Sequence, residues 1–352
     1  MIAGPGELQD EDLEALGHQV IAHYGDTWVA LHNETIDAIA RLLGASGDTY
    51  LIPGSGTTGI EMGIRNLFRP GATVVVPNSG FFGVRLAEIA TAVGLKVREV
   101  PVEVGAPIDA NRVAEAAVGA DGVISVHVDT STGVRHPIAE IAEVAHAAGG
   151  LFMVDAIASA GGEVIDVEAM GIDLLVTGTQ KGLEAPPGLA VVCLSTAGQE
   201  RIANRDFSAS SWYLDIAVWD KYRDEWGAWH PHPVTMPTNI VLALASSVKR
   251  ITDFGGHEWI ERRAALAKRC REGLAALGLL PVPSPGAEAN LIVVAWADDP
   301  STIQEHLFKE GIMIGGGLGP TAGKAIRIGL MGKSATEDMV DKALGFVGDI
   351  LK

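Results

Sequence analysis

A lysine directly after an apolar run is the first residue whose setting suggests chemistry. Lys181 lies in the segment TGTQKG at residues 177–182, just after the apolar residues 174–176. A lysine amine that loses its proton in a constrained site attacks an aldehyde and forms a Schiff base. A lysine after a strand is more often a solvated surface residue, so its companions in the sequence must decide between the two interpretations.

An acid closes another apolar run earlier in the chain. Asp155 follows the residues LFMV at 151–154, which read as a buried strand. A carboxylate held against a pyridine nitrogen keeps that nitrogen protonated, and the ring then acts as an electron sink. Lys181 and Asp155 together therefore indicate pyridoxal 5′-phosphate (PLP). A helix cap or a structural ion pair would explain the acid alone.

A turn of small residues supplies a candidate phosphate site. The turn GSGTTG at residues 54–59 lies between a strand pattern and a helical pattern. Small residues such as Ser55, Gly56 and Thr57 let backbone N–H groups approach a phosphate, and the N-terminus of the following helix favours its negative charge. Ordinary helix capping has the same composition, so the turn gains meaning only beside Lys181 and Asp155.

An arginine near the C-terminus is suited to binding a carboxylate. Arg327 follows the glycine-rich loop at residues 315–320, and its guanidinium can grip a carboxylate through two parallel hydrogen bonds. A surface salt bridge is the plain alternative. A nucleotide-binding P-loop fails the spacing test, because Lys324 is followed by Ala325 rather than by Ser or Thr.

The histidines and cysteines predict no metal site and no disulfide framework. His230 and His232 lie two residues apart, but no His-Glu-x-x-His pattern or paired cysteines accompany them. Cys193 and Cys270 are the two cysteines of the chain.

The elements that must position these residues alternate along the chain. Apolar runs at residues 73–76, 122–126, 151–154 and 174–176 read as buried strands, and helical patterns lie between them at residues 84–93, 111–118 and 138–148. This alternation predicts an α/β fold with a mostly parallel sheet covered on both faces. Ligands of such sheets bind beyond the carboxyl ends of the strands, where Asp155 and Lys181 are expected.

The regular alternation of strand and helix patterns is interrupted after residue 194. An aromatic-rich stretch at residues 211–229 precedes three prolines, and a long helical pattern with a break near Gly255 follows. We predict an N-terminal segment at residues 1–20, a large α/β domain at residues 21–237 and a smaller α+β domain at residues 238–352. The tryptophans at the sevenfold spacing 212, 219 and 226 fit the core or a subunit interface.

Composition excludes several classes of partner. The 352 residues are 47% hydrophobic and 20% charged, which is typical of a globular protein with more than one core. The net charge of −18 disfavours nucleic acid and anionic membrane surfaces, which require clustered Lys and Arg. The sequence has no signal-peptide pattern and no apolar stretch long enough for a bilayer, so a cytoplasmic location is expected.

Several motifs in order resemble the class V aminotransferases, in particular the alanine–glyoxylate and serine–pyruvate aminotransferase group. The likeness extends from Gly4 to Gly332, nearly the whole chain. Its most specific pieces are HVDTSTGV at residues 127–134, VDAIAS at residues 154–159 and GTQKGLEAPPG at residues 178–188.

The resemblance implies a fold-type-I PLP-dependent transferase with a mostly parallel seven-stranded sheet and a smaller C-terminal α+β domain. It implies a homodimer whose partner subunit completes each phosphate site. The implied roles are a Schiff base at Lys181, the pyridine-nitrogen contact at Asp155, phosphate contacts at Ser55, Gly56, Thr57 and Gln180, ring contacts at Phe82 and Thr130, the substrate carboxylate at Arg327, and phosphate contacts in trans at His232 and Thr235.

Two positions depart from the family pattern. Phe82 stands where the alanine–glyoxylate enzymes usually have a tryptophan stacked on the cofactor, and His232 stands where a tyrosine often binds the phosphate. Ring stacking survives with a smaller aromatic side chain, but the orientation of a bound substrate can change. The departures therefore affect the expected substrate rather than the expected cofactor.

Transamination by a ping-pong route is the leading hypothesis, with Lys181 as the general base. The family resemblance implies alanine or serine as donor and glyoxylate or pyruvate as acceptor, with ureidoglycine, pyridoxamine or an aminophosphonate as alternative donors. A PLP-dependent lyase or desulfurase is a second hypothesis, but Cys193 is expected in a strand and Cys270 in a helix, where a mobile catalytic thiol does not fit. A non-catalytic PLP-binding regulator is a third, and it would need a DNA-binding module with a basic helix.

Overall fold

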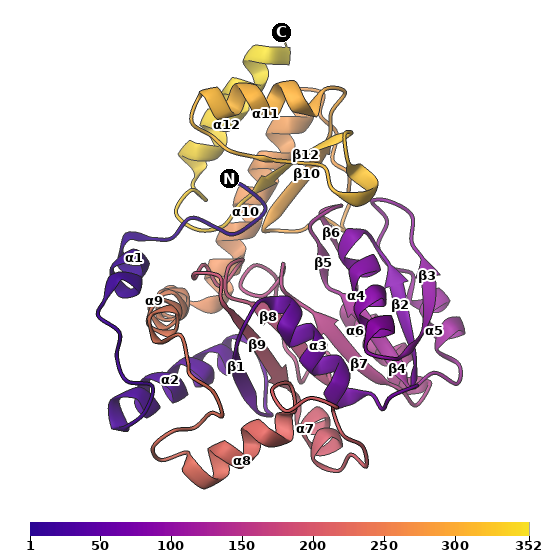
Figure 1. Ribbon diagram of the computed structural model, residues 1–352. Coiled ribbons are helices and arrows are strands. Elements are labelled where there is room, and N and C mark those ends of the chain that lie inside the picture. Colours follow the sequence, from indigo (N-terminus) through magenta and orange to yellow (C-terminus); the bar gives the residue numbers. More distant parts are fainter. Residues whose placement is uncertain (352) are drawn as a thin grey trace.

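A seven-stranded sheet forms the centre of the larger part of the molecule (Figure 1). The computed structural model describes residues 1–351. Strand β9 runs antiparallel to both of its neighbours, and the other strands run in one direction. In order across the sheet the strands are β1 (Thr49–Pro53), β9 (Leu189–Leu194), β8 (Leu174–Gly178), β7 (Leu151–Asp155), β4 (Gly122–Val126), β2 (Thr73–Asn78) and β3 (Lys96–Pro101).

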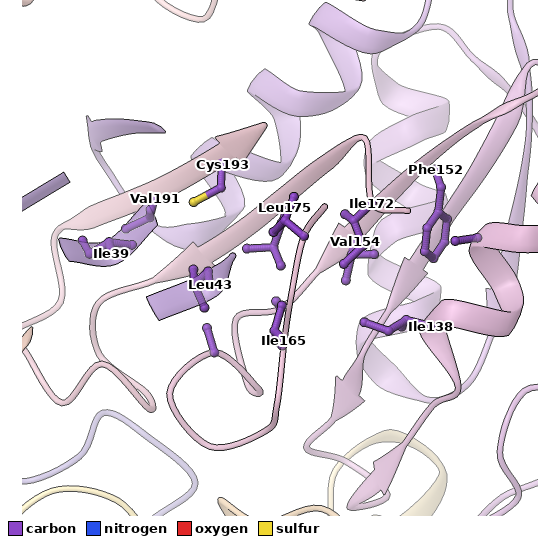
Figure 2. Packing of buried hydrophobic residues seen from close by; sticks show 14 of the residues in the cluster. Ile39, Leu43, Ile138, Phe152, Val154, Ile165, Ile172, Leu175, Val191 and Cys193 are labelled. Atoms are coloured by element: carbon purple, nitrogen blue, oxygen red, sulfur yellow. The ribbon is translucent and has the colours of Figure 1, made fainter. Parts of the chain in front are cut away.

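Helices cover both faces of this sheet, as continuous Val/Ile/Leu runs require when neither side of a strand meets water. The helices on one face are α2 (Asp26–Leu43), α5 (Ala110–Ala117), α6 (Ile138–Ala147) and α9 (Thr238–Phe254). Those on the other are α3 (Gly56–Leu67), α4 (Phe81–Ala92), α7 (Thr196–Ala203) and α8 (Ile216–Trp226). Figure 2 shows the first face, where Val191 and Leu175 of the strands lie beside Ile39 and Leu43 of α2, and Phe152 lies beside Ile138 of α6.

The smaller part of the molecule is built on an antiparallel three-stranded sheet. Its strand order is β10 (Ile292–Trp296), β12 (Ala325–Gly329) and β11 (Gly315–Gly316). Its helices are α10 (Gly256–Ala276), α11 (Pro300–Lys309) and α12 (Glu337–Leu351), and apolar residues of these helices share one core with the sheet. The predicted α/β fold with a smaller α+β part is confirmed.

The two cores separate at Gly255 rather than at residue 237. Val241, Leu244 and Val248 of α9 are buried among the strands of the large sheet, whereas Leu266 and Leu274 of α10 are buried in the core of the smaller part. The break predicted near Gly255 lies between these two helices. The prolines before α9 turn the chain without ending the large domain, so we propose Gly255 as the boundary.

The N-terminal segment links the two parts. The Met1 side chain is buried in the smaller core, and the Met1 carbonyl accepts a hydrogen bond from the Gly329 N–H of β12. The Gly6 N–H donates to the Gln180 carbonyl beside Lys181. Helix α1 (Asp10–Gly17) then packs on α9. No helix among the described residues is long and apolar enough to cross a membrane.

Candidate active site

Asp155 and Lys181 lie at the carboxyl ends of neighbouring parallel strands, β7 and just beyond β8. The Asp155 side chain is buried, and its Oδ1 accepts a hydrogen bond of 2.9 Å from the Ile157 N–H. Burial raises the pKa of Asp155 to about 6, and the Ile157 N–H and Lys181 partly oppose this rise. The carboxylate and the amine are close enough for each to shift the pKa of the other.

Lys181 is positioned to lose its proton easily. The pKa of its amine is lowered to about 8, chiefly by burial and then by the positive charge of Arg327, whereas Asp155 and Asp129 oppose this fall. The amine donates a hydrogen bond to the Ala3 carbonyl of the N-terminal segment. A larger share of this amine is therefore neutral at physiological pH than of an exposed lysine.

The N-terminus of α3 faces the same region. A Cβ added at Gly56 would lie 2.5 Å from Cδ1 of Ile157 and 3.8 Å from Cα of Gly178, so the turn touches the ends of both β7 and β8. Ser55 is the N-cap residue, but its hydroxyl makes no capping hydrogen bond, and the Ser55 and Thr57 side chains are exposed. The Gln180 side chain folds back against Gly178. This arrangement leaves backbone N–H groups and hydroxyls free for an anion.

Arg327 reaches this region from the smaller domain. It occupies the central strand β12, opposite Val294 of β10 and Gly315 of β11. Its Nε donates to the Gly316 carbonyl at 2.6 Å, and its Nη1 donates to the Thr130 carbonyl at 3.4 Å. These two bonds hold the guanidinium across the domain boundary and leave the other N–H donors free for a carboxylate.

Phe82 is fixed at the start of α4 by an acid that sequence reasoning missed. Gly80, the N-cap of α4, has no side chain to cap the helix, and Asp129 replaces it. Asp129 Oδ2 accepts from the N–H groups of Phe82 at 2.9 Å and Gly83 at 3.3 Å, while its Oδ1 accepts from the Ser131 N–H and hydroxyl. Because the Asp129–Phe82 contact joins positions 47 residues apart, only the folded chain reveals it.

Thr235 and His232, the two residues predicted to contact the phosphate of a partner subunit, differ in exposure and in hydrogen bonding. Thr235 is exposed. The His232 ring is fully buried, its Nδ1 donates to the Val234 carbonyl at 2.8 Å and its Nε2 accepts from the Trp28 indole N–H at 2.8 Å. A phosphate contact at His232 would require one of these two bonds to break.

Neither cysteine is suited to nucleophilic catalysis. Cys193 lies in β9 and Cys270 in α10, as expected, and both side chains are buried. Burial raises the pKa of each thiol to about 12. Because the thiolate is the reactive form, this geometry does not favour the desulfurase hypothesis.

Comparison with known proteins identifies the family. A family model for class-V aminotransferases matches residues 7–342. The chain belongs to this family. An uncharacterized aminotransferase of Methanocaldococcus jannaschii is 34% identical over 341 residues, which cover 94% of this chain and 87% of the relative.

Two solved structures of aminotransferases superpose on nearly the whole chain. An alanine–glyoxylate aminotransferase of Nostoc sp. gives a TM-score of 0.94 at 27% identity, covering 100% of this chain and 94% of the other. A ureidoglycine–glyoxylate aminotransferase of Bacillus subtilis gives 0.93 at 28% identity, covering 100% and 92%. The predicted family, fold and aminotransferase activity are confirmed.

Proposed function

We propose that this class-V aminotransferase uses PLP to move an amino group from a small amino acid to a small 2-oxo acid. The observation that carries the proposal is the pairing of Lys181 and Asp155 at adjacent strand ends, where burial and mutual charge shift the pKa of both groups. The free N-terminus of α3 beside them adds an anion site at the same edge of the sheet.

The side chains present fit PLP. When bound, PLP supplies a protonated pyridine ring that withdraws electrons from the amino acid Cα. The phosphate is assigned to the Ser55, Gly56 and Thr57 turn, since Gly56 permits close approach of the backbone and the Ser55 hydroxyl has no capping bond. Gln180 assists there. Phe82 would stack on the ring, and Thr130 would contact its 3-oxygen side or the substrate.

Lys181 and Asp155 handle protons in this proposal. The Lys181 amine would hold the cofactor aldehyde as a Schiff base, formed with loss of water, and the freed amine would take the proton from the substrate Cα as a general base. Its lowered pKa favours both tasks, because each requires the neutral amine. The Asp155 carboxylate would keep a proton on the pyridine nitrogen, and the positive charge there would stabilise the ionised acid.

Arg327 orients the substrate through its carboxylate. The guanidinium is held by the Gly316 and Thr130 carbonyls and is near enough to lower the pKa of Lys181, so a carboxylate bound to it lies beside the reacting amine. Glyoxylate is the acceptor that we propose first, because it appears in the names of both similar structures, which differ in the donor named, alanine or ureidoglycine.

We further propose a homodimer in which Thr235 of one subunit contacts the phosphate held by the other, with His232 supporting the Thr235 loop through its bonds to Val234 and Trp28. Mixing inactive K181A subunits with T235V subunits tests this sharing. Mixed dimers then contain one site with both native residues, and activity rises above that of either parent. Activity that stays at the sum of the parents contradicts the shared site. The cytoplasmic location stays a prediction.

A half-reaction screen tests the proposed reaction. The cofactor-loaded enzyme is mixed with single amines, including alanine, serine, ureidoglycine, pyridoxamine and an aminophosphonate, and the visible absorbance of the cofactor is followed. Alanine or serine is expected to bleach the band, and glyoxylate or pyruvate to restore it. K181A loses the band and the turnover, whereas the exposed control K268A keeps both. Unchanged turnover in K181A would overturn the proposal.

A further inference from the structure

Three histidines meet where the chain enters α2 and leaves α8. His23 precedes α2, and His230 and His232 follow α8. The Nδ1 atom of His23 lies 3.1 Å from the Nε2 atom of His230, and one ring nitrogen of each histidine lies within 4.8 Å of the others. A hydrogen bond of 2.8 Å from the Gly25 N–H to the Trp229 carbonyl ties the two loops together, so the backbone holds the rings in this arrangement.

We propose that His23, His230 and His232 bind a divalent transition-metal ion such as Zn²⁺ or Ni²⁺. A tetrahedral zinc ion with Zn–N bonds of about 2.0–2.1 Å separates its ligand nitrogens by about 3.3 Å. The His23 and His230 nitrogens already have nearly this separation. His232 completes a three-nitrogen site that leaves one position open for water or another ligand.

The ring nitrogens can reach the state that a metal requires. Nδ1 of His230 is buried without a hydrogen-bond partner, and its Nε2 is hydrogen-bonded to Nδ1 of His23, so an ion that binds both nitrogens replaces the hydrogen shared between them. Nδ1 of His232 must carry the hydrogen because it faces the Val234 carbonyl, so its Nε2 has the lone pair. Metal binding exchanges the Trp28–His232 hydrogen bond for a metal bond.

The donor set selects the class of ion. Among the described residues, the group contains three imidazoles and neither a thiolate nor a carboxylate. Imidazole suits Zn²⁺, Ni²⁺ and Cu²⁺, whereas Mg²⁺ and Ca²⁺ require oxygen ligands. An ion here clamps the start of α2 to the loop that carries Thr235. The sequence predicted no metal because His23 lies 207 residues from His230.

Calorimetric titration of the cofactor-loaded, chelator-treated enzyme with Zn²⁺ tests the site. The expected result is saturable binding of one ion per chain, no binding of Mg²⁺, and an affinity weakened about tenfold or more, equivalent to at least about 1.4 kcal/mol, in H23Q and H230Q. H257Q is the matched control, since His257 is an exposed histidine outside the group, and it keeps the native affinity.

A second measurement keeps the test independent of folding defects. Ni²⁺ is expected to quench indole fluorescence in the native enzyme, because the Trp229 ring lies 5.6 Å from the His230 ring, and the quenching should be lost in H23Q. Circular dichroism verifies that H23Q, altered in a half-buried loop, is folded. The proposal is overturned if native enzyme shows no saturable binding, or if H257Q weakens binding as much as H23Q, which would indicate an adventitious ion on surface histidines only.

Discussion

The amine of Lys181 donates a hydrogen bond to the carbonyl of Ala3, a residue 178 positions earlier in the chain. The next residue, Gly4, has a positive φ of 100° and lies directly against the lysine side chain. A Cβ at Gly4 would come within 2.5 Å of Cδ and 2.7 Å of Cε of Lys181. The N-terminal segment therefore limits where the lysine amine can move.

Replacing Gly4 with alanine should impair turnover by displacing Lys181. The added methyl group meets the lysine stem and also strains a backbone with positive φ. Because a displacement of about 1 Å can reduce a rate about 10²-fold, we expect kcat/KM to fall about 10–100-fold. Gly345 in α12 is the control, since nothing lies within 4 Å of its Cβ position. Gly345→Ala should raise the free energy of unfolding by about 0.5–1 kcal/mol and leave the kinetics unchanged.

Replacing Asp155 with asparagine should reduce kcat without unfolding the protein. Asparagine keeps the shape of the side chain but cannot hold a positive charge on the pyridine nitrogen. We expect a fall in kcat of about 10²–10³-fold, the range seen when a stabilising group is removed from a reacting centre. Asp224, which is exposed, serves as the control for the same substitution. Native kcat in Asp155→Asn would contradict the role assigned to Asp155.

The pH dependence of cofactor attachment should report the charge of Arg327. Stopped-flow mixing of the apoenzyme with PLP should give a rate that rises with pH around the Lys181 pKa of about 8, because the neutral amine attacks. Arg327 disfavours the ammonium form, so Arg327→Gln should raise this pKa and move the profile towards the ordinary lysine value of about 10.4. Arg327→Lys keeps the charge and should keep the profile. Identical profiles for the Gln and Lys variants would refute the electrostatic coupling.

A buried ion pair should contribute strongly to stability. Glu184 Oε1 accepts from Arg263 Nη2 at 2.5 Å and from the Gly332 N–H at 2.7 Å, with both side chains almost fully buried. Removing one partner leaves an uncompensated charge, so Arg263→Met should lower the free energy of unfolding by about 3–5 kcal/mol in urea titrations. Lys249→Ala breaks an exposed pair with Asp253 and should cost less than about 1 kcal/mol. If both variants lost a similar amount of unfolding free energy, burial would not explain the importance of the Glu184–Arg263 pair.

The sequence predicted the parts of the site that depend on local pattern. Lys181, Asp155 and Gly56 each lie at the end of a strand or the start of a helix, and the alternation of strands and helices brings such positions to one edge of the sheet. The Ala3–Lys181, Asp129–Phe82 and His23–His230 contacts join positions far apart, and no local pattern encodes them.

The position of the domain boundary is likewise not encoded in the local sequence pattern. The prolines before α9 are typical of a border, but the apolar periodicity of α9 does not identify the core against which the helix packs. Only packing decides that Val241, Leu244 and Val248 lie against the large sheet. Periodicity predicts that a helix has a buried side, and it does not specify which neighbour covers that side.

The anchoring of Met1 has a practical consequence for handling the enzyme. With its side chain packed in the smaller core and its carbonyl bonded to β12, Met1 offers little room for a purification tag fused in front of it. Such a fusion would displace the short segment that contacts Lys181. A tagged preparation could then lose activity because of the tag, and this loss would say nothing about the catalytic residues. Helix α12 ends at the far side of the smaller domain from the sheet that carries Lys181 (Figure 1), which makes the C-terminus the better place for an affinity tag.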